Sequence, residues 1–224
     1  MKRRDLKKAA LLRFTSGALA LGFLFFGTAG TLRYWEAWIF LAVLFLPAGL
    51  AAAYLLGHDP ELMEARLRAR EERRVQKAYV WLGSMVWLVA FVIPGLDRRF
   101  GWSSVPTWAV ILGDVLVLGG YLVFFLTLRE NRYASRIIRL VEGQTVITSG
   151  PYARVRHPMY AGVLIMLLAA PLALGSWWAV LPALATPLLL FVRIRDEEEA
   201  LLDGLPGYQA YTETTRYRLI PGVW

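Results

Sequence analysis

The stretch "TWAVILGDVLVLGGYLVFFLTL", residues 107–128, decides the fold class of this chain. Asp114 is its only charged residue. About 20 consecutive apolar residues are enough to cross the hydrocarbon core of a bilayer as an α-helix. Similar blocks precede it at about residues 11–32, 35–56 and 78–96, the last of which is expected to end at Pro94-Gly95. The sequence therefore predicts an all-α, polytopic helical membrane protein with four long transmembrane helices.

The composition agrees with this class and excludes several others. Hydrophobic residues make up 57% of the 224-residue chain, above the roughly 45–50% usual for a soluble domain. The chain has no Cys and two widely separated His, so no disulfide is possible and no metal site is expected. It also lacks the G-x-G-x-x-G, P-loop, H-E-x-x-H and G-x-S-x-G patterns of soluble nucleotide-binding proteins and common hydrolases.

Positive charge is concentrated on one predicted side of the membrane. Of the 25 Lys and Arg residues, 22 lie in the N-terminal flank, the loop 57–77, the segment after residue 128 and the C-terminal tail, whereas only Arg33, Arg98 and Arg99 lie on the other side. The positive-inside rule then predicts cytoplasmic termini in a bacterial or archaeal inner or plasma membrane. Anionic lipid headgroups explain the net charge of +8 without a nucleic-acid partner.

The first apolar block has a second possible reading. Its basic start "MKRRDLKK" and the small residues of "GTAG", residues 27–30, are also compatible with a cleaved signal peptide. Because several similar blocks follow, an anchoring first helix is the simpler interpretation.

The last part of the chain is organised differently. The polar segment 129–158 holds "QTVITSGPY", which predicts a short β-like run followed by a turn. Residues 159–192 are apolar but divided at Gly175-Ser176, which predicts a short helical hairpin and five or six spans in all. We therefore expect an N-terminal region of transmembrane helices, 1–128, and a C-terminal catalytic region, 129–224, with a cytoplasmic cofactor-binding lid.

A first polar group stands at the entrance to this hairpin, in "GPYARVRHPMY", residues 150–160. Pro158 suits the first turn of a helix, where its missing N–H is no loss. His157 would then stand beside free backbone N–H groups that can receive an anion, and Tyr160 would share its face. The alternative is that Arg156 and its neighbours only flank the bilayer while Tyr160 anchors in the interface.

A second polar group follows the hairpin, in "RIRDEEEALLDGLPGYQAY", residues 193–211. Arg193 and Glu197 are four residues apart, so they can pair on a helix. Glu197 and Glu198 could accept hydrogen bonds from a ligand, or could simply neutralise nearby arginines. Because a hairpin brings its ends together, the two groups should meet at one cytoplasmic surface, which Asn131 could also face.

Five other residues carry weaker signals. His58 is expected to be a loop residue, and Gly119-Gly120 a point of close helix packing. An intramembrane carboxylate is a functional candidate by default, but Asp114 and Glu36 lie near the non-cytoplasmic end, where an interfacial position is expected.

Three quoted motifs, "GPYARVRHPMY", "RIRDEEEALL" and "GYQAY", together resemble the isoprenylcysteine carboxyl methyltransferase family and the related membrane phospholipid methyltransferases. The resemblance extends from about residue 148 to the C-terminus. It implies that S-adenosylmethionine binds without a Rossmann fold, between the R-H-P-x-Y loop and the Glu-Glu helix, under tail residues. The spacer "LLDGLPGY" is shorter than the family pattern, which leaves the contacts of this cover open.

The resemblance also implies roles for particular residues. His157 would hold the cofactor carboxylate or help the acceptor react, and tyrosine rings would stack on adenine or face the sulfonium. The candidate catalytic residues are Asn131, Arg156, His157 and Arg193. The candidate cofactor-binding residues are Gly150, Pro151, Tyr152, His157, Pro158, Tyr160, Glu197, Glu198, Tyr208 and Tyr211.

The predicted activity is S-adenosylmethionine-dependent methyl transfer to a lipidic or membrane-soluble acceptor that bears a carboxylate, amine or hydroxyl and enters from the bilayer. A carboxylate acceptor is already ionised at pH 7, whereas an amine would need a base. The alternatives are a phospholipid or amine N-methyltransferase, an NADPH-dependent membrane reductase, since sterol reductases have a similar architecture, and a non-catalytic membrane protein. The sequence does not indicate the oligomeric state.

Overall fold

The computed structural model describes residues 3–68, 74–134 and 143–224, and within them it contains helices but no strand. The elements are α1 (Arg3–Ala29), α2 (Trp35–His58), α3 (Pro60–Arg68), α4 (Arg74–Phe100), α5 (Thr107–Glu130), the 3₁₀-helix η1 (Gly150–Ala153), α6 (Pro158–Ala173), α7 (Val180–Ala183), α8 (Thr186–Gly204) and α9 (Tyr208–Thr214). The predicted all-helical class is confirmed for this part of the chain.

Four helices are long and apolar enough to cross a membrane: α1, α2, α5 and residues 77–100 of α4. Their outer faces carry exposed large apolar side chains such as Phe23 and Leu50, as expected for surfaces that face lipid. The prediction that the third helix ends at Pro94-Gly95 is wrong, because α4 continues to Phe100. Proline removes one backbone hydrogen bond, and a membrane helix tolerates this loss where neighbouring helices support it.

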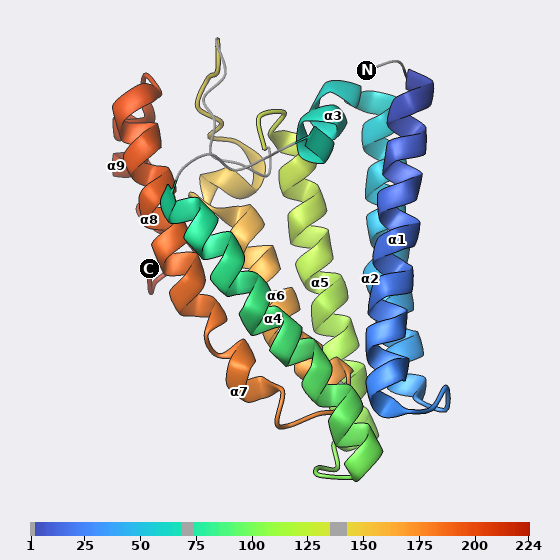
Figure 1. Ribbon diagram of the computed structural model, residues 1–224. Helices are drawn as coiled ribbons and strands as arrows, with labels where there is room; N and C mark the ends of the chain where they lie inside the picture. Colours follow the sequence, from blue (N-terminus) through green and yellow to red (C-terminus); the bar gives the residue numbers. More distant parts are fainter. Residues whose placement is uncertain (1–2, 69–73, 135–142) are drawn as a thin grey trace.

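The helices form a bundle with two distinct ends (Figure 1). At the upper end in this view lie the N-terminal end of α1, α3, the C-terminal end of α5 and α9; we call this the pocket end. The opposite end holds the short connections after α1, α4 and α6, and we call it the loop end. This arrangement places the arginine-rich segments that the structure describes largely at one end.

Helices α5 and α6 approach each other closely. A Cβ added at Gly120 would lie 2.6 Å from the Gly162 carbonyl oxygen, and one added at Gly162 would lie 2.6 Å from that of Gly120. Small residues allow such backbone contact between membrane helices. The predicted packing point is thus confirmed at Gly120, while the space around Gly119 is open. This contact fixes the start of α6 beside the end of α5.

The hairpin differs from the prediction in its second arm. α6 has 16 residues as expected, but the return begins with the single turn α7. α8 then runs without a break from Thr186 to Gly204, so one helix joins the apolar arm to the acidic motif. The predicted β-like run is wrong for its described residues, since 144–148 form a loop that leads into η1.

At the loop end, a buried carboxylate ties two connections together. Asp97 accepts hydrogen bonds from the Ser103 backbone N–H at 2.7 Å, from the Ser103 hydroxyl at 2.5 Å and from the Ser176 hydroxyl at 2.5 Å. We call these three residues the Asp97 cluster. The two other carboxylates singled out in the sequence, Asp114 and Glu36, are buried in the protein, and Glu36 lies 3.6 Å from the Arg98 guanidinium.

Candidate functional site

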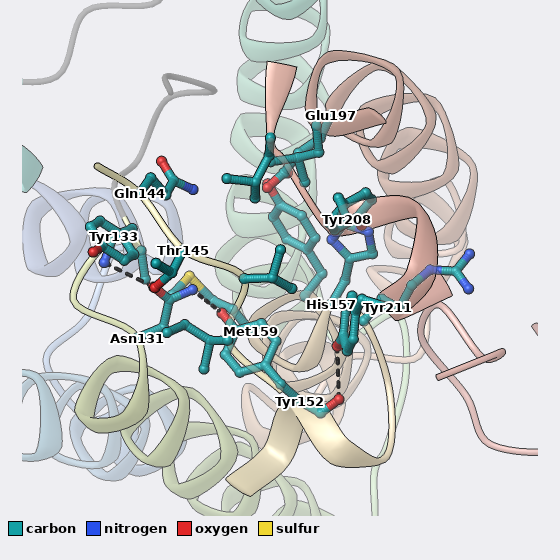
Figure 2. Close-up of a pocket in the computed structure, with 17 residues that line it drawn as sticks. Asn131, Tyr133, Gln144, Thr145, Tyr152, His157, Met159, Glu197, Tyr208 and Tyr211 are labelled. Carbon is teal, nitrogen blue, oxygen red and sulfur yellow. Dashed lines mark hydrogen bonds between the residues drawn. The ribbon is translucent and has the colours of Figure 1, made fainter. Parts of the chain in front are cut away.

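A pocket opens at the pocket end, where five segments meet (Figure 2). The end of α5, the loop 143–147, the η1–α6 segment, α8 and α9 all contribute side chains, which converge on a space of about 860 Å³ including its open mouth. Ligand pockets are typically concave and mostly apolar, with a few polar groups that converge on the ligand. The lining residues are Asn131, Tyr133, Ala134, Gln144, Thr145, Val146, Ile147, Tyr152, Arg156, His157, Met159, Tyr160, Glu197, Leu201, Leu205, Tyr208 and Tyr211.

The structure gathers most of the predicted site residues in this one place. Those that line the pocket are Asn131, Tyr152, Arg156, His157, Tyr160, Glu197, Tyr208 and Tyr211. Those that do not line it are Gly150, Pro151, Pro158, Arg193 and Glu198. The two motifs at the ends of the hairpin therefore meet as expected, although not all of their residues face the same space.

Several lining residues were not anticipated. Leu201 and Leu205 follow Glu197 at steps of four, so all three lie on one face of α8 and its end. That spacing is the signal that could have identified them. Val146 packs against the same side, but its loop position offers no comparable periodicity.

Glu198 is the centre of a buried ion-pair network. Its Oε1 accepts from Arg156 Nε at 2.6 Å and from His157 Nε2 at 3.2 Å, and its Oε2 accepts from Arg218 Nε at 2.6 Å. Burial alone would raise the pKa of this carboxyl, but the hydrogen bonds from His157, Arg156 and Arg218 lower it to about 2. Glu198 is therefore ionised and engaged with protein side chains. We call these four residues the Glu198 hub.

The hub also fastens the C-terminal tail to the R-H-P-x-Y loop. Arg156 Nη1 donates to the carbonyl oxygens of Thr215 and Arg216, at 2.9 Å each. The backbone N–H groups of Arg156 and His157 donate to the carbonyls of Tyr217 and Arg218 at 2.9 and 2.8 Å. Arg156, a predicted catalytic residue, thus holds the tail while it also lines the pocket.

Glu197 faces the pocket next to a chain of polar contacts. The Tyr160 hydroxyl donates to Glu197 Oε2 at 2.6 Å, and Arg193 Nε donates to the Tyr160 hydroxyl at 2.8 Å. The predicted pair Arg193 and Glu197 is therefore connected through Tyr160. The Arg193 guanidinium also lies 5.0 Å from the centre of the Tyr79 ring. Tyr79 belongs to α4, outside the motifs, so nothing in the sequence pointed to it.

Tyrosines form much of the remaining wall. Asn131 Nδ2 donates to the Tyr152 hydroxyl at 2.7 Å, and the Tyr211 hydroxyl donates to the Tyr152 carbonyl at 2.7 Å. The Tyr208 hydroxyl is buried and has no hydrogen-bond partner within the described residues. Burial is the main cause that raises the pKa of Tyr152 and of Tyr208, so both phenols are neutral at physiological pH.

Residues 109–203 match the isoprenylcysteine carboxyl methyltransferase (ICMT) family. The match agrees with the family resemblance seen in the motifs. It begins within α5 and ends near the end of α8, so it contains both motifs that flank the hairpin. Tyr208, Tyr211 and Arg218 lie beyond it.

A curated mouse protein, the Delta(14)-sterol reductase TM7SF2, is also similar to part of the chain. It is 37% identical over 87 residues, which are 37% of this chain and 20% of the mouse protein. The chain thus covers only a fifth of that relative's length.

Proposed function

We propose that this chain is an integral membrane methyltransferase that transfers a methyl group from S-adenosylmethionine to a membrane-soluble acceptor. The observation that carries the proposal is the pocket, in which the two family motifs meet with one glutamate, one histidine and several tyrosines on its wall. The charge distribution further predicts that the pocket end is cytoplasmic, where the cofactor is available.

The donor set of the pocket fits this cofactor. The Glu197 carboxylate can accept hydrogen bonds from ribose hydroxyls or an ammonium group. The Tyr208 hydroxyl, which has no hydrogen-bond partner in the part of the chain that the structure describes, offers a donor for the ligand. The tyrosine rings can stack on adenine or attract a sulfonium. Met159 and Tyr160 lie in the first turn of α6, whose N–H groups have no partner within the helix and can receive a carboxylate.

S-adenosylmethionine, when bound, supplies a methyl group that is already activated by its positive sulfur. The residues of the chain then need mainly to bind and orient the two reactants and to exclude water. α9 closes one side of the pocket through Tyr208 and Tyr211, and Arg156 fastens the segment that follows this helix. The Tyr160 hydroxyl orients Glu197, and the Glu198 carboxylate orients His157.

The proposed acceptor carries a carboxylate, because an ionised carboxylate needs no base. An amine acceptor would have to lose a proton first. If Nε2 of His157 donates to Glu198, Nδ1 of the neutral ring is an acceptor and could take that proton. Phospholipid or amine N-methylation is therefore the alternative within the same class.

The similarity to the mouse sterol reductase favours a second candidate, a membrane reductase that uses NADPH. The 2'-phosphate of NADPH calls for basic side chains with free donors. Arg156 is the one Lys or Arg on the pocket wall within the described residues, and it is already bound to Glu198 and to two carbonyls. The contacts of this pocket thus support the methyltransferase better.

Calorimetry with the detergent-purified chain tests the proposal. S-adenosylhomocysteine should bind with a Kd on the order of micromolar, and NADPH should not bind. Glu197→Ala and His157→Ala should each abolish the measurable heat. Glu199→Ala is the matched control. Glu199 lies two positions after Glu197 on α8 but is exposed, and this variant should bind as the wild type does.

The proposal is overturned if the folded wild-type chain binds no S-adenosylhomocysteine. Binding of NADPH alone would instead support the reductase.

A further inference from the structure

A second hollow lies at the pocket end, outside the candidate site. It runs between the end of α5, the η1–α6 segment and the C-terminal tail, and it shares none of its lining residues with the first pocket. Its space is about 1130 Å³ including the part that is open to the surroundings. We call it the α5–tail groove. Its apolar walls include Val123, Leu126, Pro158, Ala161, Leu219 and Pro221.

Two arginines stand in the lining of this groove. Arg129 is in the last turn of α5, and Arg154 follows η1. Both side chains are exposed, and neither makes a hydrogen bond or an ion pair within the described residues. A guanidinium presents its donors in a planar fork that suits a phosphate. The groove therefore offers two uncommitted phosphate-binding side chains.

The depth of these residues in the membrane suits a lipid. α5 is a candidate span that ends at Glu130, so Arg129 lies where that helix leaves the hydrocarbon. Val123 is six residues earlier, about 9 Å deeper at 1.5 Å per residue. The cationic part of the groove thus stands at the height of the headgroups, and the apolar part at the height of the acyl chains.

Among the described residues, Glu130 is the one acidic residue that lines the groove, and its carboxylate is already engaged. The Ser149 hydroxyl donates to Glu130 Oε1. With two arginines and one glutamate, the charged side chains that the structure describes in this lining sum to a net positive charge, which an anionic headgroup would balance. The arginine distribution along the chain predicts that this end faces the cytoplasm, and the cytoplasmic leaflet is the one rich in anionic lipids.

We propose that the α5–tail groove is a binding site for one anionic phospholipid. The phosphate lies between Arg129 and Arg154, and an acyl chain lies along Val123, Leu126 and Ala161. The site is separate from the methyl-transfer pocket and does not depend on the activity proposed for it. Because Leu219 and Pro221 of the tail form one wall, the bound lipid also contacts the segment that the Glu198 hub holds in place.

Native mass spectrometry of the detergent-solubilised full chain tests this site. Phosphatidylglycerol and phosphatidylethanolamine with identical acyl chains are titrated separately, and apparent Kd values are taken from the fractions of lipid-bound protein. We expect one phosphatidylglycerol to bind about tenfold more tightly than phosphatidylethanolamine. The double variant Arg129→Gln/Arg154→Gln should lose this preference.

The matched control is Arg195→Gln/Arg216→Gln. It removes the same charge from two exposed arginines outside the groove and should retain the preference. A third variant, Leu126→Trp, keeps both groove arginines but fills the apolar wall, and it should weaken phosphatidylglycerol binding. Circular dichroism and size exclusion establish that each variant is folded.

Three results would overturn the proposal. The first is equal binding of the two lipids by the wild type, and the second is an equal loss of preference in the control variant. The third is a dimer that forms without retained lipid and is abolished by Arg129→Gln/Arg154→Gln, which would mean that a second copy of the chain fills the groove.

Discussion

The Asp97 cluster and the Glu198 hub are two buried carboxylate centres at opposite ends of the same bundle. Asp97 is 1% exposed and Glu198 is 5% exposed, and each ties together segments that are distant in the sequence. Their donors differ: Asp97 receives a backbone N–H and two hydroxyls, whereas Glu198 receives two arginines and a histidine. Buried charge alone therefore does not mark a ligand site in this protein.

The difference lies in what surrounds each centre. The Asp97 cluster holds together two connections at the loop end. The Glu198 hub contributes Arg156 and His157 to the pocket wall, and the neighbouring Glu197 faces the pocket directly. Of the two adjacent glutamates on α8, Glu198 thus positions the residues of the site, while Glu197 is left available to a ligand.

Replacing each buried carboxylate by its neutral amide should give the largest difference between the two centres, measured as the loss in the free energy of unfolding. In Asp97→Asn, the amide oxygen can keep the Ser103 N–H and the NH₂ can donate to the two hydroxyls, so we expect a loss of about 1 kcal/mol in the free energy of unfolding. In Glu198→Gln, an NH₂ must face an Arg or His donor, and buried Arg156 loses its counter-ion. We expect a loss of about 3 kcal/mol or more there.

Thermal unfolding in detergent measures this difference. For a chain of this size, the expected fall in Tm is roughly 2–4 °C for Asp97→Asn and at least about 6 °C for Glu198→Gln. An equal fall in Tm for the two variants would contradict the view that the arginine and histidine donors of Glu198 make its charge more important for stability than the charge of Asp97.

The pH dependence of thermal stability should reveal the contribution of the Glu198 hub in a second way. The folded-state pKa of Glu198 is lowered from 4.5 to about 2, so its contribution to stability is present above about pH 5. It is lost as the pH falls toward 2, because the unfolded chain takes up the proton first. The Tm of the wild type should therefore approach that of Glu198→Gln as the pH is lowered from 7 to 3. A constant difference over that range would show that the ionised carboxylate is not what stabilises the hub.

The sequence predicted the parts of this architecture that depend on length, charge or proximity along the chain. The four long helices follow from the thickness of a bilayer, and the meeting of the two motifs follows from the hairpin between them. The division of labour between Glu197 and Glu198 could not be predicted in this way. The two residues are adjacent on α8, so only the position of Arg156 and Arg218 decides which one faces the pocket.

Contacts between distant segments account for most of the other features that the sequence did not predict. Tyr79 reaches Arg193 from α4, and Ser176 reaches Asp97 across 79 positions. Neither contact is indicated by a periodic pattern in the sequence. The unbroken run of α8 was not predicted either, because the apolar and acidic parts of this segment were treated as separate units, whereas one helix joins them and its Pro187 lies in the first turn, where proline is tolerated.

The smallest expected effects on stability and on ligand affinity come from substituting two tyrosines that line the pocket, Tyr208 and Tyr211. The Tyr211 hydroxyl donates to the Tyr152 carbonyl, whereas the Tyr208 hydroxyl has no partner within the described residues. Tyr211→Phe should cost about 1 kcal/mol of stability and change ligand affinity little. Tyr208→Phe should leave stability unchanged or slightly higher, because it removes a buried polar group that is not satisfied.

The same Tyr208→Phe variant should weaken S-adenosylhomocysteine binding by about tenfold, the equivalent of one lost hydrogen bond. Measuring Tm and Kd for both variants in one buffer gives a crossed result, with stability lost in one and affinity lost in the other. If Tyr208→Phe instead lowered Tm as much as Tyr211→Phe and left Kd unchanged, the hydroxyl of Tyr208 would belong to the structure of the tail. Glu197, His157 and the N–H groups of the first turn of α6 would then remain as the polar groups proposed to bind the ligand.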